Sequence, residues 1–268
     1  MKTTARVITV AVFVFLYVPM VVLAVASFNS GTFASHFEGF TLSRYAELFR
    51  DTDLLLLVRN SLIVALLSCL FATVLGTMAA IGIHAMRGRL RSLVMSVTNI
   101  PLTNPDIVTG VSLALLFAFA GRLLRINSVL GFVTLLIAHI TFDLPYVILS
   151  IMPKLRQMDS NLLDAALDLG CTPVQAFFRV MIHEILPGMI SGALMSFTMS
   201  LDDFVISYFV YGAAFPTLPV EIYNYTKKPL HPKIYALFTL LFVVILLLMV
   251  LMNLLSGRTR SSGRRDAA

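Results

Sequence analysis

Long runs of apolar, uncharged residues constrain the fold of this chain more than any other feature. A helix crosses the hydrocarbon core of a membrane with about 20 residues, each adding about 1.5 Å. Three runs of that length contain no charged residue: 7–28, 61–83 and 234–255. Three more contain only aspartate among the charged residues: 93–120, 129–152 and 189–211. Because lipid offers the backbone no hydrogen-bond partners, we predict an all-α, polytopic membrane protein with six transmembrane helices.

Composition excludes a water-soluble enzyme. Hydrophobic residues make up 58% of the chain and charged residues only 13%, whereas soluble domains average about 25% charged residues. The sequence has no phosphate-binding loop, metal-ligand cluster or nucleophile–base pair, its five histidines are scattered, and its positive charge forms no nucleic-acid-binding face. The residues Ala24-Val-Ala26 resemble a signal-peptide cleavage site, but the apolar core around them is too long for that class, so we expect a retained anchor.

Lysine and arginine predict the orientation, because they gather in cytoplasmic loops. The segment 86–92 carries three arginines and no acid, and the C-terminal tail carries four arginines against one aspartate. Both termini are therefore predicted to be cytoplasmic. We divide the chain into a first helix with an external loop (1–59), a core domain (60–253) with a long cytoplasmic loop (153–188), and a basic tail (254–268).

The cytoplasmic loop 153–188 begins with a predicted short helix. Asp159 and Ser160 are suitable N-cap residues for a helix over 161–169. Gly170 can close this helix in the left-handed conformation.

A second helix is predicted to follow directly. Thr172 and Gln175 form a Thr-x-x-Gln capping box, and Pro173 occupies the first helical position. We expect this helix to end at Pro187-Gly188, so that the loop forms two helices joined by a tight turn at the membrane surface.

The first loop helix resembles the EAA signature of ABC-importer permeases, through Asp164-Ala165-Ala166-x-x-x-Gly170. The resemblance implies the type I (MetI-like) permease fold and a helix that docks into a cytoplasmic ATPase dimer. It implies that ATP and Mg bind to that partner, and that this chain holds no cofactor. The coupling residues that it implies are Asp164, Ala165, Ala166, Gly170 and Phe177. The chain departs from the signature at Asp164, where Glu is typical, and at His183, where the family usually has proline, which favours a longer unbroken helix.

Four aspartates lie within the predicted transmembrane helices: Asp106, Asp143, Asp202 and Asp203. Inserting a charged residue at the centre of a bilayer costs about 2.5–3.5 kcal/mol, so such acids line a cavity or find a partner. None of the six runs contains Lys or Arg, which favours a cationic permeant. Cation–π contacts, worth about 0.5–2 kcal/mol each, are available from Tyr146, Tyr208 and Tyr211.

Each of these acids also has a structural interpretation. Asp106 follows two prolines, whose freed amides it can satisfy, and Asp143 precedes a predicted kink at Pro145. Asp202 and Asp203 point about 100° apart on a helix, so at most one of them readily faces a central pore.

Several segments are similar to the spermidine/putrescine permeases of the PotC type: 60–65, 196–207, 218–223 and 232–237. The resemblance runs from Asn60 to about Asn253. It implies a non-catalytic permease of the bacterial inner membrane that imports polyamines. It also implies a second permease subunit, a cytoplasmic ATPase dimer and an external solute-binding protein as partners, beside membrane lipid. The candidates for the translocation pathway are Asp202, Asp203, Asp143, Asp106, Tyr208 and Tyr211.

Two alternatives stay open at this point. The same architecture can carry another small solute, such as an iron chelate or an amino-acid-like compound. A stand-alone secondary transporter driven by aspartate protonation would predict inverted repeats, which the sequence does not display, and uptake independent of ATP.

Overall fold

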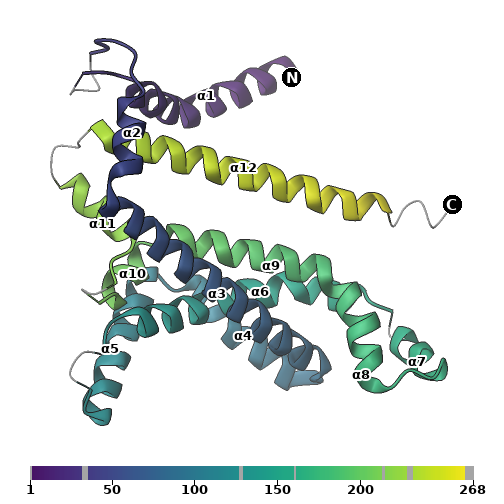
Figure 1. Ribbon diagram of the computed structural model, residues 1–268. Helices are drawn as coiled ribbons and strands as arrows, with labels where there is room; N and C mark the ends of the chain where they lie inside the picture. Colours follow the sequence, from purple (N-terminus) through teal and green to yellow (C-terminus); the bar gives the residue numbers. More distant parts are fainter. Residues whose placement is uncertain are drawn as a thin grey trace. The chain divides into compact units, whose positions relative to one another are not determined.

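The computed structural model describes residues 2–31, 36–126, 129–159, 161–212, 215–227 and 232–262. The described residues form helices joined by turns and loops, with one isolated β-bridge between Asn29 and Phe40 (Figure 1). The all-α prediction is therefore confirmed. The chain divides into two compact units, of which one holds Met1–Leu56 and Asn224–Ala268 and the other holds Leu57–Tyr223.

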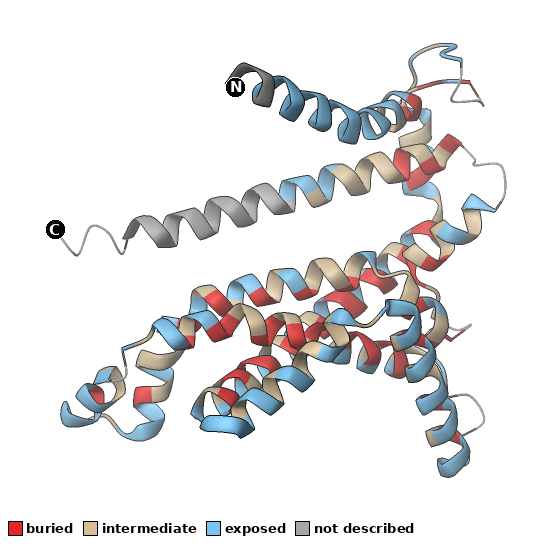
Figure 2. Ribbon diagram, turned by 180° about the vertical axis from the view of Figure 1, so that it is seen from behind, coloured by how far each residue is buried: buried red, intermediate tan, exposed pale blue. Residues whose placement is uncertain are grey.

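The first unit contains α1 (Lys2–Ser27), α2 (Ser43–Arg50) and α12 (Pro232–Ser262). Helix α1 packs against α12, and α2 also contacts α12. The loop after α1 is held by the ring of Phe28, whose centroid lies 5.4 Å from that of Phe40. The apolar side chains of α1 are exposed along almost the whole helix (Figure 2), which suits a surface that meets lipid or another apolar helix.

The second unit is built around the long helices α3 (Thr52–Ala85), α5 (Asp106–Leu124), α6 (Phe132–Gln157) and α9 (Ile182–Asp202). The first residues of α3 belong to the other unit. The shorter elements are α4 (Gly88–Thr103), α7 (Asn161–Asp168), α8 (Pro173–Ala176), the π-helical turn η1 (Phe177–Met181), α10 (Val205–Val210) and α11 (Leu218–Thr226).

Helices α6 and α9 lie side by side and form the centre of this unit (Figure 1). Glycines allow their backbones to approach closely, as in other membrane helix pairs. A Cβ atom added to Gly188 of α9 would lie 2.9 Å from the carbonyl oxygen of Ser150 on α6. One added to Gly192 would lie 3.1 Å from the Cα atom of Val147. The buried side chains of Val147, Ile151 and Ile185 fill the space around this contact.

Five helices in the described residues are long and apolar enough to cross a membrane: Arg6–Ser27, Thr52–Ala85, Asp106–Leu124, Phe132–Gln157 and Pro173–Asp202. A shorter apolar helix covers Pro232–Leu247. Five of the six predicted runs thus coincide with a spanning-length helix in at least part of their length, and the sixth coincides with the shorter helix.

The predicted span over 93–120 is interrupted at the second of the two prolines that precede Asp106. Helix α4 ends at Thr103, Asn104 is extended with φ −84° and ψ 137°, and α5 begins at Asp106. The cause is Pro105, because a proline ring disfavours helical backbone in the residue before it and removes one amide donor. Pro101, by contrast, lies inside α4 without ending it.

The predicted span over 189–211 is also interrupted. Helix α9 ends at Asp202, Asp203 is extended with φ −64° and ψ 116°, and α10 begins at Val205. An aspartate side chain can bond to nearby backbone amides and so competes with helix continuation.

The second loop helix does not end at Pro187-Gly188, which corrects the sequence prediction. The helical segment runs without a break from Pro173 to Asp202. A proline in a helix interior costs about 3 kcal/mol. Here the close packing of Gly188 on α6 and the complete burial of Ile185 hold the helix together across the proline.

Candidate functional site

A cluster of polar side chains is enclosed by α3, α6, α9 and α10 within the second unit. We call it the buried polar network, and its members are Ser68, His139, Asp143, Ser196, Ser200, Asp203 and Ser207. The spacing of four residues between His139 and Asp143, and between Ser196 and Ser200, places each pair on one face of its helix. Buried polar groups require partners, and these helices supply them to one another.

His139 of α6 lies at the centre of the network and is only 2% exposed. Its Nδ1 atom lies 2.5 Å from the hydroxyl of Ser200 on α9, and its Nε2 atom lies 3.0 Å from the hydroxyl of Ser207 on α10. The hydroxyl of Ser68 on α3 donates to Ser200 at 2.9 Å. The imidazole thus connects α6 directly to α9 and α10, and it reaches α3 through the hydroxyl of Ser200.

Asp203 lies where α9 ends. Its carboxylate accepts hydrogen bonds from the backbone amides of Ile206 at 3.2 Å and Ser207 at 2.7 Å. It therefore caps the first turn of α10, where unpaired amides favour a negative charge. One of its carboxylate oxygens also lies 3.5 Å from Nε2 of His139. These contacts turn the side chain inward, away from its neighbour Asp202, which is exposed.

The two adjacent acids thus occupy different environments, as the sequence predicts, but for a different reason. The prediction places both on one helix at different angles. In the structure the helix ends between them, and capping of α10 separates the two side chains.

Asp143 is completely buried. Its Oδ2 atom accepts a hydrogen bond from Ser196 at 2.7 Å, while Oδ1 has no hydrogen-bond partner among the described residues. Helix α6 continues through Pro145 without interruption. Asp143 therefore bonds to the neighbouring helix α9 through Oδ2. Because the residue is completely buried, a further donor can reach Oδ1 only if the helices around it move apart.

The other predicted pathway residues lie outside the buried polar network. Asp106 is exposed at the first position of α5. Tyr211 packs partly buried against the apolar cluster around Ile206 and Val210. Tyr208 is 40% exposed.

Tyr208 belongs to a group of three aromatic rings, of which the sequence prediction named only Tyr208 itself. The ring centroid of Phe204 lies 5.5 Å from that of Tyr208 and 4.5 Å from that of Tyr223. The two tyrosines are 6.0 Å apart, and each is 40% exposed. We call Phe204, Tyr208 and Tyr223 the aromatic cluster. Exposed ring faces of this kind attract ammonium groups, and the exposed Asp202 precedes the cluster by two residues.

The helix–turn–helix prediction for the loop 153–188 is confirmed at the turn between the two helices. Gly170 has φ +86°, in the left-handed region. The amide of Gln175 donates to the Thr172 hydroxyl at 3.3 Å, and the Thr172 amide donates to the Gln175 side chain at 3.0 Å. Asp159 caps the first helix through the amide of Asn161 at 2.9 Å, while Ser160 lies outside the described residues.

The same segment presents apolar side chains on its surface. Leu169 is 87% exposed, and Leu167, Val174 and Phe178 are also exposed. Asp164, Ala165 and Gly170 are exposed, whereas Ala166 is buried. Phe177, in the π-helical turn that the sequence did not predict, packs edge-on against Phe178 with ring centroids 5.0 Å apart. Exposed apolar groups of this density are typical of a surface that another protein covers.

Sequence reasoning missed the serines of the buried polar network. Ser196 and Ser200 lie four residues apart on α9, and this spacing is the signal that could have indicated a shared polar face on that helix. Their partners on α3 and α10 come from distant parts of the sequence, so the pairing depends on the fold.

Comparison with known proteins places the chain among transport proteins. The model of the family described as "Binding-protein-dependent transport system inner membrane component" matches residues 72–261. The chain is 35% identical over 253 residues to the spermidine/putrescine transport system permease protein PotC of Escherichia coli, covering 94% of this chain and 93% of that protein. It is 38% identical over 232 residues to the putrescine transport system permease protein PotI of the same species, covering 85% and 82%.

Solved structures show the same fold. A chain of a bacterial ABC transporter involved in the import of the acidic polysaccharide alginate superposes with a TM-score of 0.74 at 15% identity, covering 96% of this chain and 95% of that one. A chain of the MetNI methionine ABC transporter superposes with a TM-score of 0.59 at 18% identity, covering 82% and 97%.

Proposed function

Because this chain belongs to the family of binding-protein-dependent inner-membrane transport components, we propose that it is the permease subunit of an ATP-driven importer of the polyamines spermidine, putrescine or both. The chain is a multi-pass protein of the bacterial inner membrane. The observation that carries the proposal is the 35–38% identity, over most of the chain, to permeases of polyamine transport systems.

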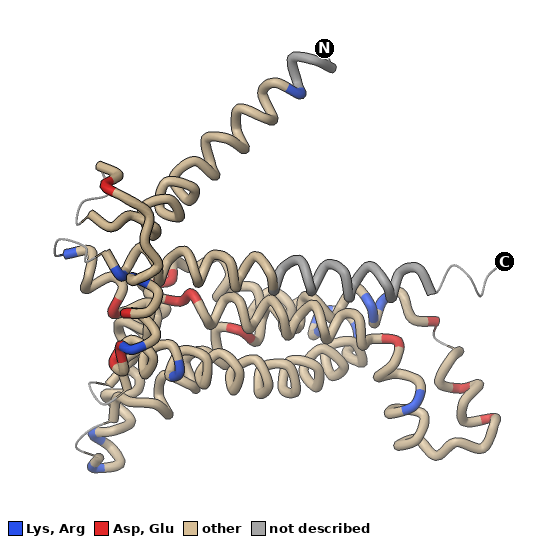
Figure 3. The backbone as a smooth tube through the Cα atoms, turned by 45° about the horizontal axis from the view of Figure 1, so that its top comes forward, with Lys and Arg blue, Asp and Glu red and all other residues tan. Residues whose placement is uncertain are grey.

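The charges of the membrane-spanning part support a cationic cargo. Among the described residues, no Lys or Arg forms an ion pair with Asp106, Asp143, Asp202 or Asp203. Most of the length of the helices carries no charge at all (Figure 3). Acids without basic partners attract a polyamine, whose ammonium groups can also contact aromatic faces. In this proposal Asp202 and the aromatic cluster meet the cargo first, while Asp143 and Asp203 lie behind the helix surface.

The cytoplasmic loop supports coupling to a partner ATPase. In the proposal, the helix α7 and its exposed apolar neighbours dock into the ATPase dimer, with Asp164, Ala165, Ala166, Gly170 and Phe177 at or beside the contact. ATP and Mg bind in that dimer, and its closure moves α7 as a rigid body. The proposal also includes six membrane crossings, cytoplasmic termini, a second permease subunit and an external binding protein that delivers the polyamine.

In the proposal, the π-helical turn transmits the movement of α7 to the membrane-spanning helix α9. The turn lies between α8 and α9, and α9 ends at Asp202, directly before Asp203. A wide turn within a helix is a common site of adjustment. A push on α7, which contacts α8 and the π-helical turn, would therefore reach the polar network through the helical segment Pro173–Asp202 and would open the pathway alternately to each side.

One experiment tests the proposal directly. The chain is reconstituted in proteoliposomes with its partner permease, ATPase and binding protein, and ATP hydrolysis and labelled polyamine uptake are measured. Spermidine or putrescine should stimulate both, whereas an iron chelate or an amino acid should stimulate neither. Equal stimulation by a chelate or an amino acid would refute the polyamine assignment.

A second candidate rests on the buried pair of His139 and Asp203. Two titratable groups 3.5 Å apart inside a membrane protein are also found in proton-coupled carriers. That candidate predicts polyamine accumulation by this chain without the ATPase, driven by a pH gradient alone, and the same proteoliposomes decide between the two.

A further inference from the structure

Two adjoining cavities lie between α4 and α6 in the second unit. They lie beside the segment 86–92, which is predicted to be cytoplasmic. One has a volume of about 340 Å³ and is lined by polar residues, which include Arg91, Ser92, Ser96, Asn99 and Arg156. Ser92, Ser96 and Asn99 recur at spacings of four and three residues, which places them on one face of α4. Arg156 enters the cavity from the last turn of α6.

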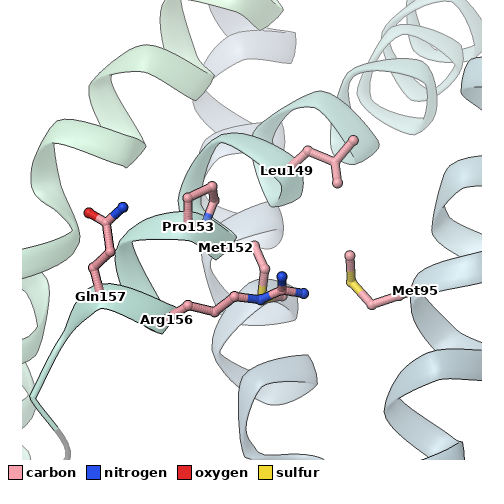
Figure 4. A pocket seen from close by; sticks show the side chains of 6 residues that line it. All are labelled: Met95, Leu149, Met152, Pro153, Arg156 and Gln157. Atoms are coloured by element: carbon pink, nitrogen blue, oxygen red, sulfur yellow. The ribbon is translucent and has the colours of Figure 1, made fainter.

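The second cavity is mainly apolar. It has a volume of about 280 Å³, and its lining includes Met95, Leu149 and Met152 (Figure 4). Met95 and Arg156 line both cavities, so the polar and apolar spaces adjoin at these two side chains. Together they form one site with a cationic end and an apolar end, which we call the basic pocket.

The charge in the basic pocket has no protein counter-ion. Among the described residues, neither Arg91 nor Arg156 forms an ion pair with an acid. The guanidinium of Arg91 makes a weak contact with the sulfur of Met152 at 3.7 Å. The side-chain oxygen of Asn99 is buried and has no hydrogen-bond partner in the part of the chain that the structure describes. An anion that also carries a hydroxyl would satisfy all three groups, because guanidinium binds phosphate oxygens strongly and the amide oxygen accepts from a hydroxyl.

The surroundings favour lipid as the source of that anion. No residue of α4 is buried, and Leu90, Leu93 and Val97 are 58%, 61% and 55% exposed. An exposed apolar helix beside a basic pocket at the cytoplasmic end of a membrane protein is the setting in which anionic headgroups bind. If the proposed polyamine function holds, the pocket is not part of the exit route, because two unpaired guanidinium groups repel a polycation.

We propose that the basic pocket binds the phosphate of an anionic glycerophospholipid such as phosphatidylglycerol. Arg91 and Arg156 bond to the phosphate oxygens, Asn99 accepts from a headgroup hydroxyl, and Met95, Leu149 and Met152 contact the glycerol and the first acyl carbons. The lipid thereby ties α4 to α6 beside the cytoplasmic loop that follows α6.

The test measures lipid that stays with the assembled complex. The complex is purified from vesicles of equimolar phosphatidylglycerol and phosphatidylcholine, and native mass spectrometry identifies the retained lipid. The wild type should retain phosphatidylglycerol in preference. The double variant R91Q/R156Q should weaken this retention by about 25-fold, since each arginine near an anionic headgroup contributes a factor of about five. The matched variant R122Q/R125Q, which removes two exposed arginines at the end of α5, should retain the lipid as the wild type does.

Three outcomes would overturn the proposal. Equal retention by R91Q/R156Q and the wild type would show that the pocket is not the lipid site. Retention of both lipids by the wild type in their bulk ratio would exclude selective binding, and this readout stands even if the double variant fails to assemble. Displacement of the bound lipid by inorganic phosphate at submillimolar concentration would assign the pocket to a free anion. Because the readout is lipid mass, a failure here leaves the polyamine proposal untouched, and the converse also holds.

Discussion

The imidazole Nε2 of His139 on α6 lies 3.5 Å from a carboxylate oxygen of Asp203, the residue that separates α9 from α10. The same carboxylate caps α10, and the same imidazole contacts serines on α9 and α10. The break in the fifth predicted span is therefore fixed by a polar contact from another helix. If the proposed transport cycle moves α9 relative to α6, this contact must rearrange.

Replacing His139 by alanine should destabilise the assembled complex. The hydroxyls of Ser200 and Ser207 and the carboxylate of Asp203 would all lose a partner inside a buried site. The expected loss is about 1–3 kcal/mol, because hydrogen bonds between membrane helices are individually weak but unsatisfied buried groups add to the cost. The melting temperature in detergent measures it, and His183→Ala, at an exposed position of α9, is the control. Equal melting temperatures for the two variants would contradict the central role of His139.

The neighbouring acids Asp202 and Asp203 should respond differently to the same change. Asp203→Asn weakens the charged cap of α10 and should cost about 1 kcal/mol of stability. Asp202→Asn removes an exposed charge, so it should leave stability unchanged and raise KM for polyamine uptake. Melting temperature and uptake are measured on both variants. A stability loss in Asp202→Asn with none in Asp203→Asn would reverse the assignment.

The hydrogen bond between Ser196 and Asp143 should appear as an energetic coupling. The variants Ser196→Ala and Asp143→Asn, and their combination, form a double-mutant cycle with an expected coupling of about 0.5–2 kcal/mol. Ser191→Ala is the matched control, because its hydroxyl bonds to a carbonyl of its own helix at 2.9 Å. Ser191→Ala and Asp143→Asn should therefore be additive. A cycle through Ser196 that is also additive would show that this bond contributes nothing.

The parts of this fold that depend on local chemistry could be predicted from the sequence. Apolar runs fix the long helices, and the residues Gly170, Thr172 and Gln175 fix the turn of the loop 153–188 through backbone conformation and capping. These effects act over a few residues, so neighbours in the sequence are sufficient to predict them.

The parts that depend on contacts between helices could not. Pro105 and Pro187 have the same intrinsic effect on a helix, yet the chain breaks at the first and continues through the second. The difference is the packing of Gly188 against α6, which no local pattern reports. The sequence also does not show which of the two aspartates turns inward. Asp203 contacts the imidazole of His139 on α6 and the amide of Ser207 on α10, and neither group belongs to α9.

A side chain at position 170 should impair coupling. Gly170 has φ +86°, where an L-residue costs about 1–2 kcal/mol. Gly170→Ala should therefore lower polyamine-stimulated ATP hydrolysis and uptake together, while Gly170→Asn, which tolerates this conformation better, should retain more of both. Gly82→Ala, at a helical position with open space around it, should behave as the wild type. Full stimulation in Gly170→Ala would argue against a rigid turn in the docking segment.

The ion pair between Asp51 and Lys233 should make the stability of the first unit depend on pH. Lys233 Nζ donates to Asp51 at 2.5 Å, and this bond holds the pKa of the Asp51 carboxyl below its ordinary value of 3.8. A depressed pKa stabilises the folded state above pH 3.8, and the contribution is lost as pH falls through the lower folded-state value. Because both side chains are partly exposed, the contribution should not exceed about 1 kcal/mol.

Asp51→Asn should therefore lower the melting temperature at pH 7 and at pH 5 by similar amounts. The difference from the wild type should shrink below pH 3.8, where the wild-type carboxyl also loses its charge. Asp53→Asn, two residues away at an exposed position, removes an equal charge without this partner and serves as the control. A difference between Asp51→Asn and the wild type that persists unchanged into acid would mean that hydrogen bonding of the side chain, not its charge, stabilises this corner of the protein.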